Sequence, residues 1–127
     1  MKQITLYAAF LGLTSVIMGA ASDHLFAGLL TAESAQRFDV ALRYHQLYAI
    51  LVFSMGLYGL RTAEPPSFKI AGYLFCVGCT IFCGSLYASL FPSLDKATIL
   101  TPIGGLTIMA AWVSCMISVL LSIKRKS

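Results

Sequence analysis

Long apolar runs without charge alternate with short polar segments along this chain. The runs extend from Gln3 to Ser22, Gln46 to Leu60, Ile70 to Phe91 and Pro102 to Ile123. A helix needs roughly 20 apolar residues, at about 1.5 Å each, to cross a bilayer core of about 30 Å. The second run is too short by itself, so its helix must also include residues 41–45. The pattern therefore predicts four transmembrane helices, over residues 3–22, 41–60, 70–91 and 102–123.

The connection between the first two helices also has a helical pattern. Thr31 can cap a helix whose first turn holds Glu33. Acid and base follow each other at a spacing of four residues in two pairs, which are Glu33 with Arg37 and Asp39 with Arg43. The opposite, less polar face holds Phe38, Ala41, Leu42 and His45. The second helix is therefore expected to start in the outer interface and to run into the membrane. We expect an all-α membrane protein, a bundle of four transmembrane helices with an additional interfacial helical segment in the first outer loop, folded as one domain over residues 1–127.

The composition excludes two broad classes of function. Hydrophobic residues make up 58% of the chain and charged residues only 11%, with a mean hydropathy of +0.83. These values are far from those of a soluble enzyme of this size. The net charge of +4 is scattered between apolar runs and forms no basic stripe. The expected surroundings are thus a lipid bilayer, and nucleic acid is not an expected partner.

Basic residues favour one orientation, because Lys and Arg in short loops stay on the cytoplasmic side. One side of the predicted bundle would hold Lys2, Arg61, Lys69, Lys124, Arg125 and Lys126, and the other Arg37, Arg43 and Lys96. We therefore expect both termini in the cytoplasm. The first segment also imitates a secretory signal, with Lys2 before an apolar stretch and small residues at its end. Small residues along one of its faces favour a retained packing helix instead.

Small residues at helical spacing predict where the helices pack against each other. The fourth helix carries Ala110, Ser114, Ser118 and Ser122, and the third carries Gly72, Cys76, Cys79 and Cys83. Trp112 lies near the middle of the fourth helix, where its indole N–H needs a partner. Cys76 and Cys79 have the spacing of a redox pair, but apolar burial disfavours the reactive thiolate. Packing is the favoured interpretation of these cysteines.

The titratable residues near the membrane form one cluster in the sequence. His24 and His45 flank the first outer loop, with Asp23, Arg43 and Tyr44 nearby. Two imidazoles can hold a metal or haem or relay protons, but a structural metal site normally has further ligands. Anchoring at the interface is the favoured interpretation, so no cofactor is expected. The core segments contain no Asp or Glu, which argues against a proton-coupled exporter.

Two motifs give the chain a family resemblance. They are Phe82-Cys83-Gly84-Ser85-Leu86-Tyr87 and Thr101-Pro102-Ile103-Gly104-Gly105, the second followed by Trp112. With Gly19-Ala20 before His24, and Arg43-Tyr44 at the second helix, the chain resembles the YgdD-like small bacterial inner-membrane proteins, related to eukaryotic transmembrane protein 256. The resemblance implies a four-helix protein of the bacterial inner membrane and no reaction.

The residues of these motifs have physical interpretations of their own. Thr101 can cap the fourth helix and Pro102 suits its first position. Gly104 and Gly105 would permit close approach to Gly84 and Ser85, so the two motifs are expected to meet. Tyr87 would lie above that junction, beside the loop that carries His24. The candidate functional or packing residues are His24, Arg43, Tyr44, His45, Gly84, Ser85, Tyr87, Thr101, Pro102, Gly104, Gly105 and Trp112.

These observations favour a protein that is not an enzyme. Seams of small residues without intramembrane charge suggest that it acts through protein contacts, as a homo-oligomer or as an accessory subunit of a larger membrane complex. The alternative is a carrier or channel for a small or lipid-like solute, entered beside His24 and Tyr87. A polar cavity between the helices would favour the alternative, and dense packing would oppose it.

Overall fold

The protein is all-helical across the part of the chain that its structure describes. The computed structural model describes residues 1–24, 26 and 28–126, apart from the side chains of Asp23, Arg125 and Lys126. Its elements in chain order are α1 (Lys2–His24), α2 (Ala32–Gly59), α3 (Pro66–Ala88), the 3₁₀ helix η1 (Pro92–Leu100) and α4 (Thr101–Lys126). No strand occurs among these described residues, which confirms the all-helical prediction.

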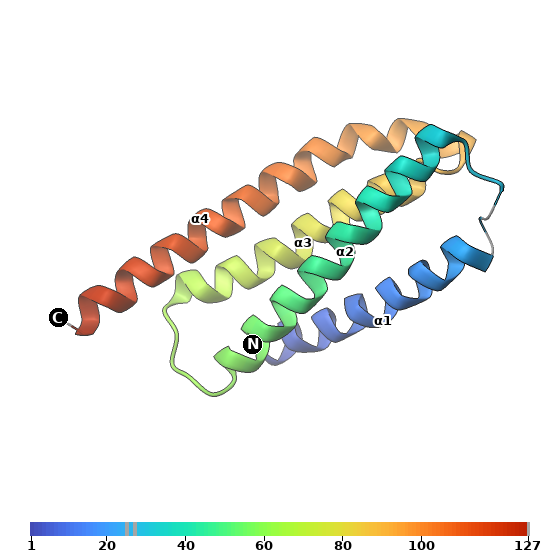
Figure 1. Cartoon of the computed structure of the whole chain (residues 1–127). Coiled ribbons are helices and arrows are strands. Elements are labelled where there is room, and N and C mark those ends of the chain that lie inside the picture. The colour runs from blue at the N-terminus through green and yellow to red at the C-terminus, as the bar shows by residue number, and fades with distance from the viewer. Residues whose placement is uncertain (25, 27, 127) are drawn as a thin grey trace.

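The helices lie as two neighbouring hairpins (Figure 1). α1 packs on α2, α3 packs on α4, and the hairpins join mainly where α2 meets α3. Among the described residues, the backbone of α4 approaches neither α1 nor α2. One end of the molecule, called here the η1 end, carries η1 and the start of α2. The opposite end, called the 60–65 end, carries the turn of residues 60–65 together with Met1 and the end of α4.

α2 starts nine residues earlier than the predicted second membrane helix. Thr31 has an extended backbone, with φ −69° and ψ 164°, and its hydroxyl accepts a hydrogen bond from the backbone N–H of Ser34. Glu33 lies in the first turn, so the predicted cap is confirmed. The charged residues from Glu33 to Arg43 do not interrupt the helix. The segment predicted as an interfacial helix is therefore the beginning of α2 and not a separate element.

The connection between α3 and α4 also differs from the expectation. α3 ends at Ala88 rather than at residue 91, and η1 begins at Pro92 after Phe91 adopts an extended backbone. Proline fixes its own φ and restricts the residue before it, which explains the break. The sequence pattern did not indicate that residues 92–100 form a 3₁₀ helix. α4 follows without a further break.

Apolar side chains occur both inside the hairpins and over the outer surface. Ile4, Phe38, Val52, Phe75 and Cys79 are fully buried. Large apolar side chains on the outside stay exposed, for example Leu6 at 75% and Ile50 at 68%. Such a surface is expected when lipid surrounds the helices. Within the described chain, three segments are long and apolar enough to cross a membrane: Lys2–Ser22, Pro66–Ala88 and Pro92–Lys124.

Candidate functional site

The two sequence motifs meet where α3 packs on α4. A Cβ atom on Gly104 would lie 2.5 Å from the backbone nitrogen of Phe82 and 2.7 Å from its Cα. One helical turn further, the hydroxyl oxygens of Ser85 and Thr101 are 2.6 Å apart. Only glycine allows this approach, because real Cβ atoms do not come so close to a neighbouring backbone. The expected meeting of the motifs is therefore present, with Phe82 and not Gly84 as the partner of Gly104.

Three details of the predicted junction are wrong. Gly84 is exposed, and a Cβ on it would meet nothing within 4 Å. A Cβ on Gly105 would only reach ordinary contact with the ring of Phe82, at 3.9 Å. Thr101 has helical φ and ψ, continues the chain from η1, and bonds Ser85 with its hydroxyl instead of capping α4. Pro102 lies in the first turn of α4 with its side chain exposed.

Serine hydroxyls continue the α3–α4 contact toward the 60–65 end. Ser114 donates to the backbone oxygen of Ser67 at 2.8 Å, and Ser118 donates to the Ser67 hydroxyl at 2.7 Å. Both α4 serines are buried. Ala110, predicted on the same seam, is exposed, while the neighbouring Ala111 is fully buried. The packed face is thus rotated slightly from the expected one.

His45 joins three helices through its imidazole. Its Nε2 lies 3.2 Å from the hydroxyl oxygen of Thr14 on α1, and its Nδ1 lies 3.3 Å from the hydroxyl oxygen of Tyr87 on α3. Thr14 donates its own proton to backbone oxygens of α1, those of Phe10 and Leu11. The threonine oxygen is thus left to accept from Nε2–H, and Tyr87 then donates to Nδ1. A neutral His45 with its proton on Nε2 satisfies both of these hydrogen bonds.

This arrangement separates the two histidines that the sequence placed in one cluster. His45 is buried at 6% exposure, whereas His24 ends α1 with an exposed side chain. No hydrogen bond joins the two among the described residues, and the side chain of Asp23 lies outside them. A metal or haem at His45 would have to replace one of its two hydrogen bonds. The described side chains contain no group of three metal-ligating residues.

Tyr87 packs against α2. Its ring lies 5.6 Å from the ring of Phe38 and 5.9 Å from the ring of His45. The ring of Phe38 also lies 5.8 Å from the ring of Phe26, in the connection between α1 and α2. The position of Tyr87 beside the loop of His24 stays a prediction, because parts of that loop lie outside the described residues.

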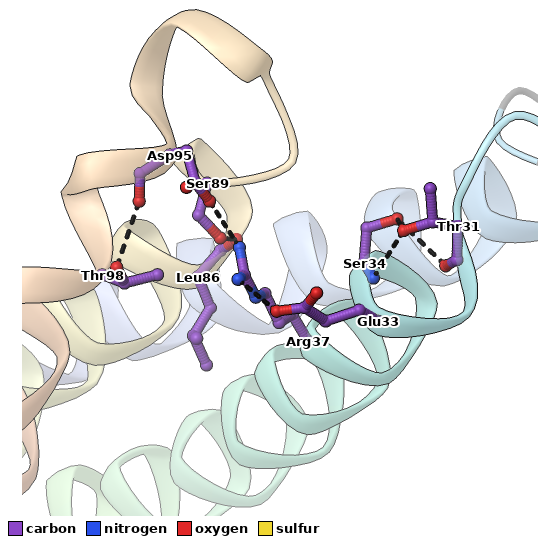
Figure 2. Close-up of polar contacts among 8 residues, drawn as sticks. All are labelled: Thr31, Glu33, Ser34, Arg37, Leu86, Ser89, Asp95 and Thr98. Carbon is purple, nitrogen blue, oxygen red and sulfur yellow. Dashed lines mark hydrogen bonds and ion pairs between the residues drawn. The ribbon is translucent and has the colours of Figure 1, made fainter.

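Two ion pairs of Arg37 lie at the η1 end, and one of them connects α2 to η1 (Figure 2). Arg37 on α2 donates to Glu33 one turn earlier and to Asp95 on η1, each at 2.6 Å. The two carboxylates raise the pKa of the Arg37 guanidinium above its usual value, mainly through the hydrogen bond to Asp95. The predicted Glu33–Arg37 pair is thus confirmed. Asp39 and Arg43, the second predicted pair, form no ion pair within the described structure.

Aromatic side chains fill the space between α2, α3 and α4. The indole N–H of Trp112 donates to the hydroxyl of Tyr48 at 3.4 Å, and its ring meets Phe75 edge to face at 5.2 Å. Trp112 is still 47% exposed, so only part of it faces the neighbouring helices. Tyr44 packs on the ring of Phe82 at 4.8 Å, while the adjacent Arg43 is exposed. This cluster bridges the two hairpins at mid-height.

The cysteines of α3 lie on the packed face. Cys76, Cys79 and Cys83 are buried and free, and the sulfur atoms of Cys79 and Cys83 are 3.8 Å apart along the same helix. The Cys76–Cys79 spacing brings no sulfur pair to the surface. Small size and apolar character explain their position on this face.

Sequence reasoning missed the residues that connect separate helices. Thr14, Tyr48 and Asp95 carry contacts to partners far away in the chain, and a local pattern contains no information on such partners. For Thr14, the signal in the sequence is a hydroxyl group within an apolar helix. Such a hydroxyl needs a hydrogen-bond partner in lipid. For Asp95 no local feature distinguishes it from a solvated loop acid.

Comparison with known proteins identifies the family. The family model described as protein of unknown function DUF423 matches residues 18–105. A UPF0382 membrane protein of Haemophilus influenzae is 31% identical over 113 residues, which cover 89% of each chain. The UPF0382 membrane protein YwdK of Bacillus subtilis is 25% identical, over 93% of this chain and 96% of its own.

The UPF0382 inner membrane protein YgdD of Escherichia coli K12 is 22% identical, over 95% of this chain and 91% of its own. No solved structure matches. The matches extend over nearly the whole chain and agree with its apolar helices. The chain therefore belongs to the DUF423 family of membrane proteins of unknown function, the YgdD-like family that the two motifs indicated.

Proposed function

We propose that this protein crosses the inner membrane four times and acts there through protein contacts, as a homo-oligomer, without catalysing a reaction. A related form of this proposal is that the protein is an accessory subunit of a larger membrane complex. Both termini and the 60–65 end would lie in the cytoplasm, since most of the basic residues belong to that end.

The proposal of a fourth span depends on the direction of the helices. α1 and α3 both run from the 60–65 end to the η1 end. If both cross the membrane, the chain must return across it between them, and α2 is the segment that makes this return. Its 28 residues extend about 42 Å. Residues 41–59 extend close to the roughly 30 Å of the bilayer core, so Arg43 would lie at its outer edge and the charged turns from Glu33 to Asp39 at the outer interface.

The observation that carries the oligomer proposal is a groove between α1 and α2, open to the outside. It has a volume of about 500 Å³, and its floor holds small residues, including Ala8, Gly12 and Ala49. A Cβ on Gly12 would meet nothing within 4 Å, so another backbone has room to approach. Small residues at such a surface allow close helix association in membranes.

A polar side chain lies on the same groove. The amide of Gln46 is exposed and makes no hydrogen bond with any residue that the structure describes. A carboxamide both donates and accepts, so it is complementary to a copy of itself. An unpaired amide facing lipid is costly, and pairing with the same group of a second chain removes that cost. A second copy is therefore the occupant that this groove fits best.

Disulfide crosslinking in native membranes tests the oligomer. We expect Gly12→Cys to give a dimer when the membranes are treated with copper phenanthroline, because the two grooves would face each other. Phe10→Cys is the matched control, since Phe10 is 57% exposed on α1 and does not line the groove. Equal dimer from both variants, or from neither, would contradict the proposal, as would a strictly monomeric protein in native mass spectrometry.

The carrier alternative has less support. Every buried side-chain nitrogen or oxygen that the structure describes has a hydrogen-bond partner. The grooves between helices are open at the surface and lined mainly by apolar side chains. A path for a polar solute would need unpaired polar groups along it.

A further inference from the structure

A short slot separates α2 from α4 at the 60–65 end. The two helices diverge there (Figure 1). Side chains of α2, α3 and α4 line a volume of about 370 Å³ between them. Met55 and Tyr58 form the α2 side, Val119 and Ile123 form the α4 side, and Phe68 of α3 forms the floor. The slot is open toward the surroundings of the bundle. An occupant can therefore enter from the membrane that surrounds the bundle.

The slot is too short for a membrane-spanning helix. Its α4 side runs from Cys115 to Ile123, a rise of about 12 Å. The slot ends, on the side away from residues 60–65, at Tyr48, Phe75 and Trp112. These three side chains connect α2 to α4 there. A length of about 12 Å is contained within one leaflet of a bilayer core of about 30 Å. The shape thus fits a lipid chain of one leaflet and not a helix of a partner protein.

The mouth of the slot carries an acid without a partner. Glu64 lines the slot, is half-buried, and forms no ion pair or hydrogen bond through its side chain with any described residue. The hydroxyl of Ser122 lies on the same slot. Arg61 and Lys124, both exposed and free of ion pairs in the described structure, belong to the same end. An acid on the slot, at an end of the molecule that also carries bases, is complementary to a headgroup that has one cationic and one anionic group.

We propose that this slot binds a phospholipid whose headgroup carries a primary ammonium, with the ammonium on Glu64 and an acyl chain between α2 and α4. A primary ammonium donates hydrogen bonds, which a carboxylate accepts strongly. A headgroup with a quaternary ammonium has no such donor, and one with only a phosphate has no cation for Glu64. The site uses different residues from the α1–α2 groove, so it does not depend on the oligomer.

Native mass spectrometry of the full chain in a mild detergent tests the site. Phosphatidylethanolamine, phosphatidylcholine and phosphatidylglycerol with identical acyl chains are added one at a time. We expect the ethanolamine lipid to give a one-to-one complex at about a tenfold lower concentration than the other two, since a charge-assisted hydrogen bond is lost with them. Equal binding of the three lipids, or preference for either of the others, would overturn the proposal.

Two pairs of variants locate the site. Glu64→Gln should remove the preference for the ethanolamine lipid, whereas Asp39→Asn, which changes an exposed acid without an ion pair on α2, should retain it. Val119→Trp fills the slot and should abolish the complex. Leu120→Trp adds the same side chain next to it, at a position that is 60% exposed and outside the slot, and should leave the complex intact. An unchanged preference in Glu64→Gln, or the same result for both tryptophan variants, would overturn the proposal.

Discussion

At the scale of single residues, contacts within the hairpins differ from contacts between them. Inside a hairpin the backbones touch, as at Gly104 against Phe82 and at Gly56 against Thr5, where a Cβ would lie 3.0 Å from the Thr5 Cα. Between the hairpins polar and aromatic side chains add to apolar packing, as in the bond of His45 with Tyr87 and the approach of Ile4 to Gly72. Substitutions at the two kinds of contact should therefore destabilise the protein for different physical reasons.

Gly104→Ala should destabilise the protein, while Gly84→Ala should not. The added methyl group at Gly104 collides with the backbone of Phe82, and overpacking of this kind costs about 1–3 kcal/mol. At Gly84 the methyl group meets open space, and alanine favours the helix by up to about 1 kcal/mol. Thermal unfolding of the purified protein in detergent measures both. Equal losses at the two positions would mean that α3 and α4 do not touch at Gly104.

Tyr87→Phe should also reduce stability, because it leaves Nδ1 of His45 without a donor. An unsatisfied buried acceptor costs about 1–3 kcal/mol. Tyr44→Phe serves as the control, since the Tyr44 hydroxyl bonds no described residue while its ring packs on Phe82. The same unfolding measurement applies. If both variants keep the stability of the parent, the His45–Tyr87 bond contributes nothing to the fold.

At the scale of elements, the sequence predicted the apolar helices well and their junctions poorly. Charge-free runs located α1, α3 and α4 because lipid tolerates few charges in a span. The same rule misplaced the start of α2, since charged residues such as Glu33 and Arg37 are compatible with a helix once they leave the lipid.

The candidate site was predictable only in outline. The motifs predicted that residues 82–87 meet residues 101–105, which the structure shows. The small size of Gly84 did not reveal which way it faces, because a difference of one residue rotates a position by about 100° around a helix. The partners of His45 and Arg37 lie on other helices, and spacing along the chain cannot identify them.

η1 packs on α3 and α4 and is joined to α2 by an ion pair. Arg37 of α2 forms this ion pair with Asp95 of η1, and none of the η1 residues is buried. Arg37→Gln should therefore increase amide hydrogen exchange across residues 92–100, as followed by mass spectrometry. Arg43→Gln, which changes an exposed arginine without an ion pair on the same helix, should leave exchange there unchanged. Unchanged exchange in both variants would show that η1 is held by its packing alone.

At the scale of the whole molecule, the proposed orientation can be tested from outside the cell. Lys69 belongs to the 60–65 end and Lys96 to the η1 end, so cysteines at these positions should face opposite sides of the membrane. We expect an impermeant thiol reagent to label Lys96→Cys in intact cells and to label Lys69→Cys only after the membrane is opened. The reverse result would invert the topology.

The division into two hairpins has a consequence for how the protein is made. Each hairpin joins helices that are consecutive in the chain, α1 with α2 and α3 with α4, so its contacts are available as soon as the second helix emerges during synthesis. In the proposed four-span arrangement, each pair can enter the lipid as a unit, and the pairs then dock through His45, Arg37 and the contact of Tyr48 with Trp112. Defects at these docking residues should thus leave insertion intact and delay the final assembly, whereas a defect at Gly104 should already disturb the second pair as it forms.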